Sequence, residues 1–218
     1  MAEGFDIRLT RAQERYEQAV FGGDAKSLDE AERDLVALEA DTALARGRLL
    51  HARFLETGAE DAAELSLFER AAQLYRELGD PRGEGESLFW VGTVHQVIRG
   101  DQAAADPVFA RARELATEAG DELTLSYVLR HLCFGEQAAG RVDAARGLLE
   151  ESTRLRRKLS FTPGVAANLI GLAYLAASDG ERDAARGLLD EAASLATGSD
   201  AHGVARWVEE ARDELKLA

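Results

Sequence analysis

The seven residues Asp143-Ala-Ala-Arg-Gly-Leu-Leu149 recur without change as Asp183-Ala-Ala-Arg-Gly-Leu-Leu189, 40 residues further along the chain. Each copy begins three residues after a glycine, and further glycines stand at positions 100 and 120, with near matches at 79 and 198. A helix of about 16 to 18 residues closed by glycine fits this interval, because glycine adopts the left-handed C-cap without steric cost. Two such helices per 40-residue unit predict a helical repeat array.

The composition agrees with an all-α fold. Of 218 residues, 46% are hydrophobic and 30% are charged, and only three are proline. Ala, Leu, Glu and Arg are abundant, and all four are strong helix formers. No linker rich in Pro, Gly or Ser divides the chain. We therefore expect one domain over residues 1–218, because a repeat array grows linearly around a shared core.

The predicted architecture is an α-solenoid of about five antiparallel helix hairpins closed by a C-terminal capping helix. The clearest repeats are residues 80–120, 121–161 and 162–198, and the capping helix covers 200–216. We expect eleven helices, near residues 5–21, 24–39, 41–57, 60–78, 82–99, 102–118, 121–139, 142–159, 163–178, 181–197 and 200–216.

The prolines mark helix starts. Pro81 and Pro163 follow good N-cap residues, and proline suits the first helical position, where its missing N–H has no partner to lose. Pro107 falls inside a helix expected to start near Gln102. This predicts either a late start or a local kink for that helix.

Equivalent positions in the second helices are occupied alike. Phe109, Leu149 and Leu189 align, and we expect them to fill the seam between hairpins. Three small residues align as well and are expected to let helices approach closely: Ala104, Ala144 and Ala184.

These patterns resemble the tetratricopeptide repeat (TPR) family. Gly92 with His95 matches its first-helix pair of a small residue followed by an aromatic, and Ala105 with Phe109 matches its second-helix pair. The 40-residue spacing is similar to the long variant in bacterial regulators and kinesin light chains. The resemblance implies a right-handed superhelix whose first helices line a concave, partner-binding surface.

One predicted first helix carries a candidate binding surface. Its side chains at i, i+3, i+4 and i+7 share one face, and neighbouring repeats would extend that surface. An aromatic, a guanidinium and an imidazole side by side would suit an acidic or aromatic peptide segment. The alternative is that Tyr127 and Phe134 are buried between repeats while Arg130 is merely solvated. The candidate peptide-binding residues are Trp90, Tyr127, Arg130, His131, Phe134 and Asn168.

Charge and hydropathy limit the partners. The formal net charge is −14, which disfavours direct binding to nucleic acid or to anionic membranes. No apolar stretch is long enough to span a bilayer, and no secretory signal is evident at the N-terminus. Basic residues are almost all arginine, which is typical of a GC-rich bacterial genome. We therefore expect a cytoplasmic bacterial protein.

Motifs for metal binding and catalysis are missing. The four histidines never form a His-x3-His pair, and Cys133 is the single cysteine, expected to be an inert core residue. The segment Gly83-Glu-Gly-Glu-Ser87 lacks the third glycine and the lysine of a phosphate loop. We expect no cofactor, no metal and no catalytic residue.

The first functional hypothesis is a non-enzymatic scaffold that binds a peptide or helix of a cytoplasmic partner. The second is a regulatory sensor that binds a small molecule or signalling peptide and acts in trans on a transcription or signalling protein. An all-helical enzyme of unrecognised type is a third. The final helix carries an apolar stripe that includes Trp207 and Val208, which either caps the last hairpin or forms a homodimer contact.

Overall fold

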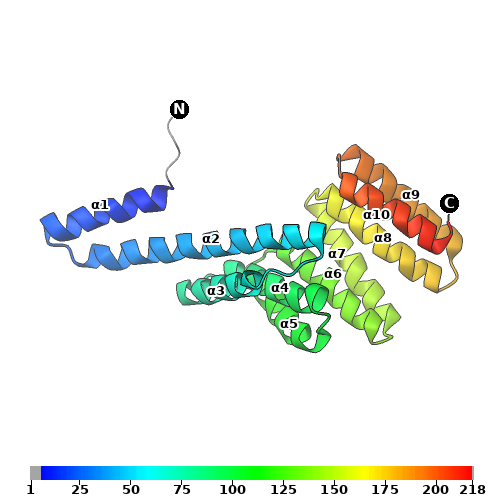
Figure 1. The fold of residues 1–218 in the computed structure, drawn as a ribbon, viewed down its shortest axis with the longest axis horizontal. Helices are drawn as coiled ribbons and strands as arrows, with labels where there is room; N and C mark the ends of the chain where they lie inside the picture. The colour runs from blue at the N-terminus through cyan, green and yellow to red at the C-terminus, as the bar shows by residue number, and fades with distance from the viewer. Residues whose placement is uncertain (1–5, 218) are drawn as a thin grey trace. The chain divides into compact units, whose positions relative to one another are not determined.

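The computed structural model describes residues 6–217. Within this range the chain forms ten α-helices and no strand, and short turns join the helices in sequence (Figure 1). The predicted all-α helical repeat fold is thus confirmed. The helices are α1 (Ile7–Gly22), α2 (Lys26–Thr57), α3 (Ala63–Leu78), α4 (Pro81–Thr93), α5 (Gln102–Glu118), α6 (Glu122–Ala138), α7 (Val142–Lys158), α8 (Thr162–Ser178), α9 (Arg182–Gly198) and α10 (His202–Leu215).

The helices group into two compact units, with the boundary between Ala119 and Gly120. The first unit holds α1–α5 and the second holds α6–α10. The boundary coincides with the junction between two predicted repeats.

In the first unit, α2 is a single helix of 32 residues (Figure 1). The prediction of two helices, 24–39 and 41–57, was wrong, because neither glycine nor proline occurs between residues 26 and 46 to end the first. Helix α1 lies along the N-terminal half of α2, where Arg11 and Arg15 both bond to Asp34. Helix α3 packs along its C-terminal half.

Three helix starts in the middle of the chain follow aspartate N-caps, whereas α8 begins at Thr162, so the prediction that Pro163 is its first residue was wrong by one position. Asp80, Asp101 and Asp121 cap α4, α5 and α6 through bonds to backbone N–H groups. Asp101 caps α5, which starts at Gln102, so of the two predicted alternatives the late start is excluded and Pro107 lies inside the helix. Helix α4 continues into a π-helical turn over Val94–Ile98.

The 20-residue interval marks the helix ends. Glycines 79, 100, 120, 140 and 180 all have positive φ, as the left-handed C-cap requires. Where the interval lacks a glycine, Ser160 and Asp200 adopt φ of 55° and 53° instead. Gly198, the near match in the sequence, is the last helical residue of α9.

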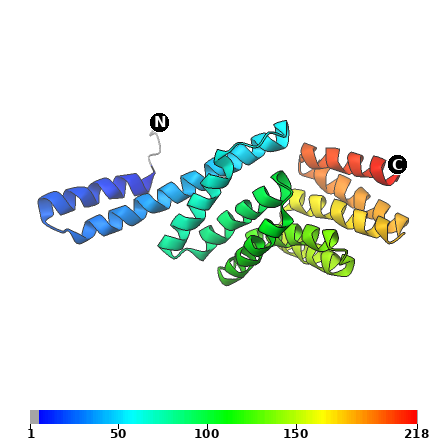
Figure 2. The same ribbon diagram turned by 60° about the horizontal axis from the view of Figure 1, so that its bottom comes forward.

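In the second unit, α6 pairs with α7 and α8 pairs with α9, and the last helices stack in chain order (Figure 2). Leu149 and Leu189 are buried in a continuous core with Ala145 and Ala185. The small buried residues therefore stand one position after the expected Ala144 and Ala184, which are exposed. One residue corresponds to 100° around a helix, which accounts for this correction.

Helix α10 covers the end of this core. Val204, Val208 and Ala211 are buried against α8 and α9, as expected for a capping helix. Trp207 lies on the other side and is 43% exposed. Val208 is therefore inaccessible to a second copy of the chain, whereas Trp207 is accessible.

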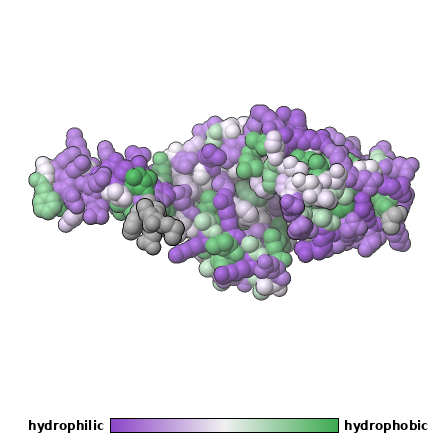
Figure 3. Space-filling view, turned by 90° about the horizontal axis from the view of Figure 1, so that it is seen from above, coloured by the Kyte–Doolittle hydropathy of each residue, from purple (hydrophilic) through white to green (hydrophobic). Residues whose placement is uncertain are grey.

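The face of the molecule seen in Figure 3 is largely hydrophilic. Apolar side chains gather at the turn between α1 and α2, at the left end of that view, where Val20 and Phe21 are exposed. None of the helices in the described part of the chain is long and apolar enough to cross a membrane.

Candidate functional site

Four side chains of α6 share one side of that helix, as their spacing predicts. The His131 and Phe134 rings meet edge to face with centroids 5.6 Å apart, and the Arg130 guanidinium carbon lies 5.2 Å from the centre of the Phe134 ring. Tyr127, one turn earlier, lies against Arg156 of α7, whose guanidinium carbon is 4.7 Å from the tyrosine ring centre. All four side chains are half-buried, so the face is neither a bare surface nor a closed core.

Arg130 connects α6 to α8. Its Nη1 donates to the backbone oxygen of Ala167 at 2.9 Å and to Oδ1 of Asn168 at 3.0 Å. The other N–H groups of Arg130 have no acceptor among residues 6–217. Arg130 therefore presents unused donors on a helix face that is held in place from behind.

Arg156 of α7 donates to the same amide oxygen. It is 2% exposed, and its Nη1 donates to the backbone oxygen of Gly164 at 2.8 Å and to Oδ1 of Asn168 at 2.9 Å. Its Nε donates to Oγ of Ser126 at 3.3 Å. Its Nη2 is buried and has no acceptor, which is uncommon for a charged donor.

Asn168 occupies the centre of this cluster and is completely buried. Its Oδ1 accepts from both guanidinium groups, while its Nδ2 donates to Oγ of Ser152 at 2.8 Å. The expectation from the sequence that Asn168 extends the binding surface was therefore wrong. Asn168 lies behind that surface and positions the two arginines.

The two arginines lack a countercharge. No carboxylate lies within 4.0 Å of either guanidinium in the described residues, and every acceptor they use is neutral. Burial lowers the pKa of Arg130 to about 10. Burial lowers the pKa of Arg156 to about 9, and repulsion from Arg130 adds to that effect. Both remain protonated at neutral pH, so two neighbouring positive charges, one buried and one half-buried, lie at this cluster.

Sequence reasoning missed Arg156, although the repeat carries a signal for it. Positions 116, 156 and 196 are equivalent in the 40-residue repeat, and the outer two are buried alanines. Ser152 likewise stands where Ala112 and Ala192 are buried. A charged residue at a position that is alanine in the sister helices could have been found by aligning the repeats.

Trp90 belongs to the first unit and packs among aromatic rings there. It stacks on Phe68 with centroids 5.5 Å apart and meets Phe89 at 5.0 Å and His51 at 5.1 Å. Its indole N–H is buried without an acceptor. Trp90 is thus part of an aromatic cluster of the first unit, whereas the α6 side chains belong to the second unit.

A buried acid lies beside this aromatic cluster. His51 Nδ1 is 2.9 Å from Oε1 of Glu64, whereas Oε2 of Glu64 has no partner. Burial raises the pKa of Glu64, opposed by its bond to His51. The pair links the C-terminal part of α2 to the start of α3.

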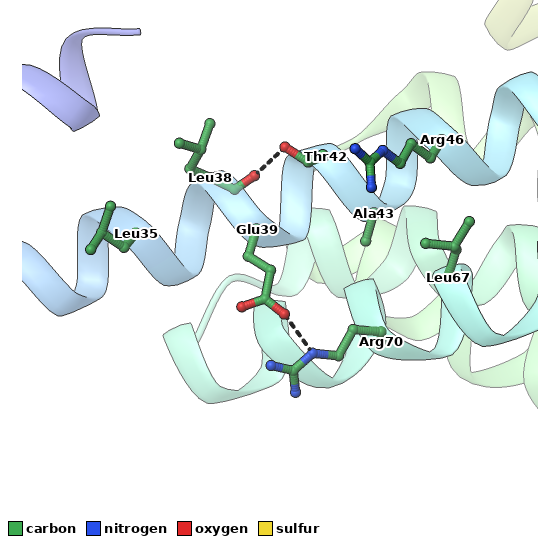
Figure 4. A pocket seen from close by; sticks show the side chains of 8 residues that line it. All are labelled: Leu35, Leu38, Glu39, Thr42, Ala43, Arg46, Leu67 and Arg70. Atoms are coloured by element: carbon green, nitrogen blue, oxygen red, sulfur yellow. Dashed lines mark hydrogen bonds and ion pairs between the residues drawn. The ribbon is translucent and has the colours of Figure 1, made fainter. Parts of the chain in front are cut away.

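A shallow groove lies between α2 and α3 (Figure 4). Its volume is about 380 Å³, and Leu35, Leu38 and Leu67 form its apolar wall. At its edge Arg70 donates to Glu39 at 2.8 Å. The groove offers mainly apolar contact, and its polar lining residues are Glu39, Thr42, Arg46 and Arg70, of which Glu39 and Arg70 bond to each other.

Metal ligands do not converge anywhere in residues 6–217, since no three His, Cys, Asp or Glu side chains are arranged to hold an ion. Cys133 is completely buried, and burial raises its thiol pKa to about 11. The predicted burial of this cysteine is confirmed, and a raised thiol pKa favours the unreactive thiol form.

Comparison with known proteins adds evidence on the fold. No protein-family model matches this sequence, and no curated protein matches it. Among solved structures, the crystal structure of BtubC (BKLC) from P. vanneervenii is similar, with a TM-score of 0.56 over 97% of this chain and 87% of that chain. The two sequences are 16% identical, so the likeness concerns the fold.

Proposed function

We propose that this chain is a TPR-like, non-enzymatic binding module that holds a segment of a partner protein against the face of α6. The observation that carries the proposal is the face built from Arg130 and Phe134, in which a guanidinium with unused donors lies beside an aromatic ring. Arginine and aromatic residues dominate the energetics of protein interfaces. The half-buried state of these side chains also supports binding, because they are already partly ordered before a partner arrives.

The scaffold beneath this face is rigid. Arg130 is fixed to α8 by two hydrogen bonds, and α6 is packed against α7 along its length. Preorganised side chains lose less entropy on binding. Helical repeats that pack in sequence and resemble BtubC (BKLC) in fold are consistent with TPR membership, which we include in the proposal.

Site-specific photo-crosslinking in cells would test the proposal. A benzophenone amino acid would replace Phe134 on the α6 face or, as a matched control, the exposed Glu150 on α7. We expect a discrete protein adduct from position 134 and none from position 150. The adduct should disappear when Arg130→Ala is added and helicity by circular dichroism is unchanged. Adducts from both positions alike, or from neither, would remove the support for binding at this face.

A further inference from the structure

The second unit holds two cations, the buried Arg156 and the half-buried Arg130, with no carboxylate within 4.0 Å of either among residues 6–217. The Nη1 atoms of Arg130 and Arg156 are each within 3.0 Å of the same oxygen of Asn168, which places them within about 6 Å of each other. An unpaired buried charge carries a desolvation penalty that neutral acceptors only partly offset. The two positive charges are therefore not neutralised by any carboxylate in the described part of the chain.

Packing alone does not require this arrangement. The sister helices α5 and α9 carry the buried residues Ala116 and Ala196 at the position of Arg156. They also use Ala112 and Ala192 in place of Ser152. A polar cluster that replaces a well-packed apolar seam in only one repeat points to a function for that repeat.

We propose that Arg130 and Arg156 form a carboxylate-binding site on the α6–α8 face, and that its occupant is an acidic side chain of the partner segment. The inference rests on the proposed function and names the chemistry that this face recognises. A guanidinium presents its donors as a planar fork that matches a carboxylate. The free donors of Arg130 would contact the carboxylate, and Arg156 behind it would add positive potential.

The surroundings suit such an occupant. Phe134 provides an apolar wall on which the methylene groups of a glutamate can lie. The Tyr127 and Phe161 rings both lie beside the Arg156 guanidinium, whose carbon is 4.7 and 5.6 Å from their centres, so its charge stays in place. The net charge of −14 repels an acidic segment from most of the protein surface, so a local pair of unbalanced cations would attract the acidic side chain specifically to this face.

Nuclear magnetic resonance of the full chain with 15N-labelled arginine would test the site. The Nε–Hε signal of Arg130 would be followed during titration with N-acetylated, C-amidated tetraglutamate, with tetraglutamine and with acetate, all at constant ionic strength. We expect a saturable shift with tetraglutamate, at least tenfold weaker binding of acetate, and no shift with tetraglutamine.

Three variants complete the test. Arg130→Met should weaken tetraglutamate binding at least tenfold, whereas Arg206→Met should leave it unchanged. Arg206 is the control because it is an exposed arginine of the same unit whose charge already has a neighbouring carboxylate, Glu210, at 3.8 Å. Asn168→Asp should also weaken binding at least tenfold, since it supplies the missing negative charge internally. Tetraglutamate binding to Asn168→Asp as tightly as to the wild type would overturn the site.

The outcomes separate the site from the proposed function. If acetate binds as tightly as tetraglutamate, the carboxylate site stands but its assignment to a peptide side chain is overturned. If no titrant shifts the Arg130 signal, the carboxylate site is overturned. A partner adduct at position 134 would still support the binding module in that case.

Discussion

The substitution Asn168→Asp provides the sharpest test of the unbalanced charge in the second unit. It replaces the amide at the centre of the cluster with a carboxylate of the same shape and places it within hydrogen-bond distance of Arg130 and Arg156. The expected result is a more stable protein at neutral pH, although the position is completely buried. An acid introduced into most interiors has the opposite effect.

The magnitude follows from the charges already present. Each guanidinium would attract the carboxylate by about 4 kcal/mol at the effective dielectric constant of about 20 that suits protein charges. Desolvation of the new carboxylate costs several kcal/mol, but the two arginines are already desolvated in the wild type. The hydrogen bond from Asn168 to Ser152 would be lost, which costs about 1 kcal/mol. We expect a net gain of about 1–3 kcal/mol.

The gain should depend on pH with a definite sign. The two guanidinium groups would hold the pKa of the new carboxylate below its unfolded value of about 3.9. Stability from an acid with a depressed pKa is present above the unfolded pKa and is lost as the pH falls through the folded pKa. The difference from the wild type should therefore be full at pH 7 and should shrink below about pH 4.

Urea denaturation followed by tryptophan fluorescence would measure the effect. Both proteins would carry Trp90→Phe, so that only Trp207 of the second unit reports. A gain of about 2 kcal/mol corresponds to a midpoint shift of about 1 M for an m-value near 2 kcal/mol/M. Asn168→Leu is the matched control, because it keeps the approximate volume, removes the shared acceptor and should destabilise by about 2–5 kcal/mol. If Asn168→Asp destabilises the unit as Asn168→Leu does, our account of the cluster is incorrect.

Three further outcomes are expected. Gly92→Ala should destabilise the first unit by about 1–3 kcal/mol, because the new methyl group would lie 2.6 Å from a phenylalanine ring of α5. Gly147→Ala has open space around it and should stabilise α7 by about 0.5–1 kcal/mol. Thermal melts of the two variants would show the contrast, and equal effects would contradict it. Cys133 should react with a thiol reagent at pH 8 only after unfolding, and prompt labelling of the native protein would disprove its burial. Val208→Ala should lower the free energy of unfolding by about 1–3 kcal/mol, while Trp207→Ala should change it by less than about 0.5 kcal/mol. A change of molecular mass in solution for Trp207→Ala alone would reveal that Trp207 contacts a second copy of the chain.

Part of the fold is encoded by local chemistry and could be predicted from the sequence. Glycines 100, 120, 140 and 180 end helices because the left-handed C-cap favours glycine, and the structure gives each of them a positive φ. Asp80 and Asp101 start helices because their side chains satisfy exposed N–H groups. The sequence also lacks a helix-ending signal near residue 40, which the prediction of two helices overlooked, and α2 continues through that position.

The candidate site could be predicted only in part. The spacing of Tyr127, Arg130, His131 and Phe134 determines that they share one side of a helix, and ring contacts within this set agree. The spacing does not determine what lies beneath that side. For that reason Asn168 was expected on the surface, although it is buried.

The sequence by itself determined a helical repeat array, because periodicity, caps and glycine turns act over a few residues and need no distant partner. Only the tertiary structure decided that Arg156 of α7 and Arg130 of α6 meet at one amide of α8, because that meeting depends on how three helices rotate about their axes when they pack. A shift of one residue turns a side chain by 100°, which separates a buried alanine from an exposed one. The charge left unbalanced by that packing is a property of the folded chain.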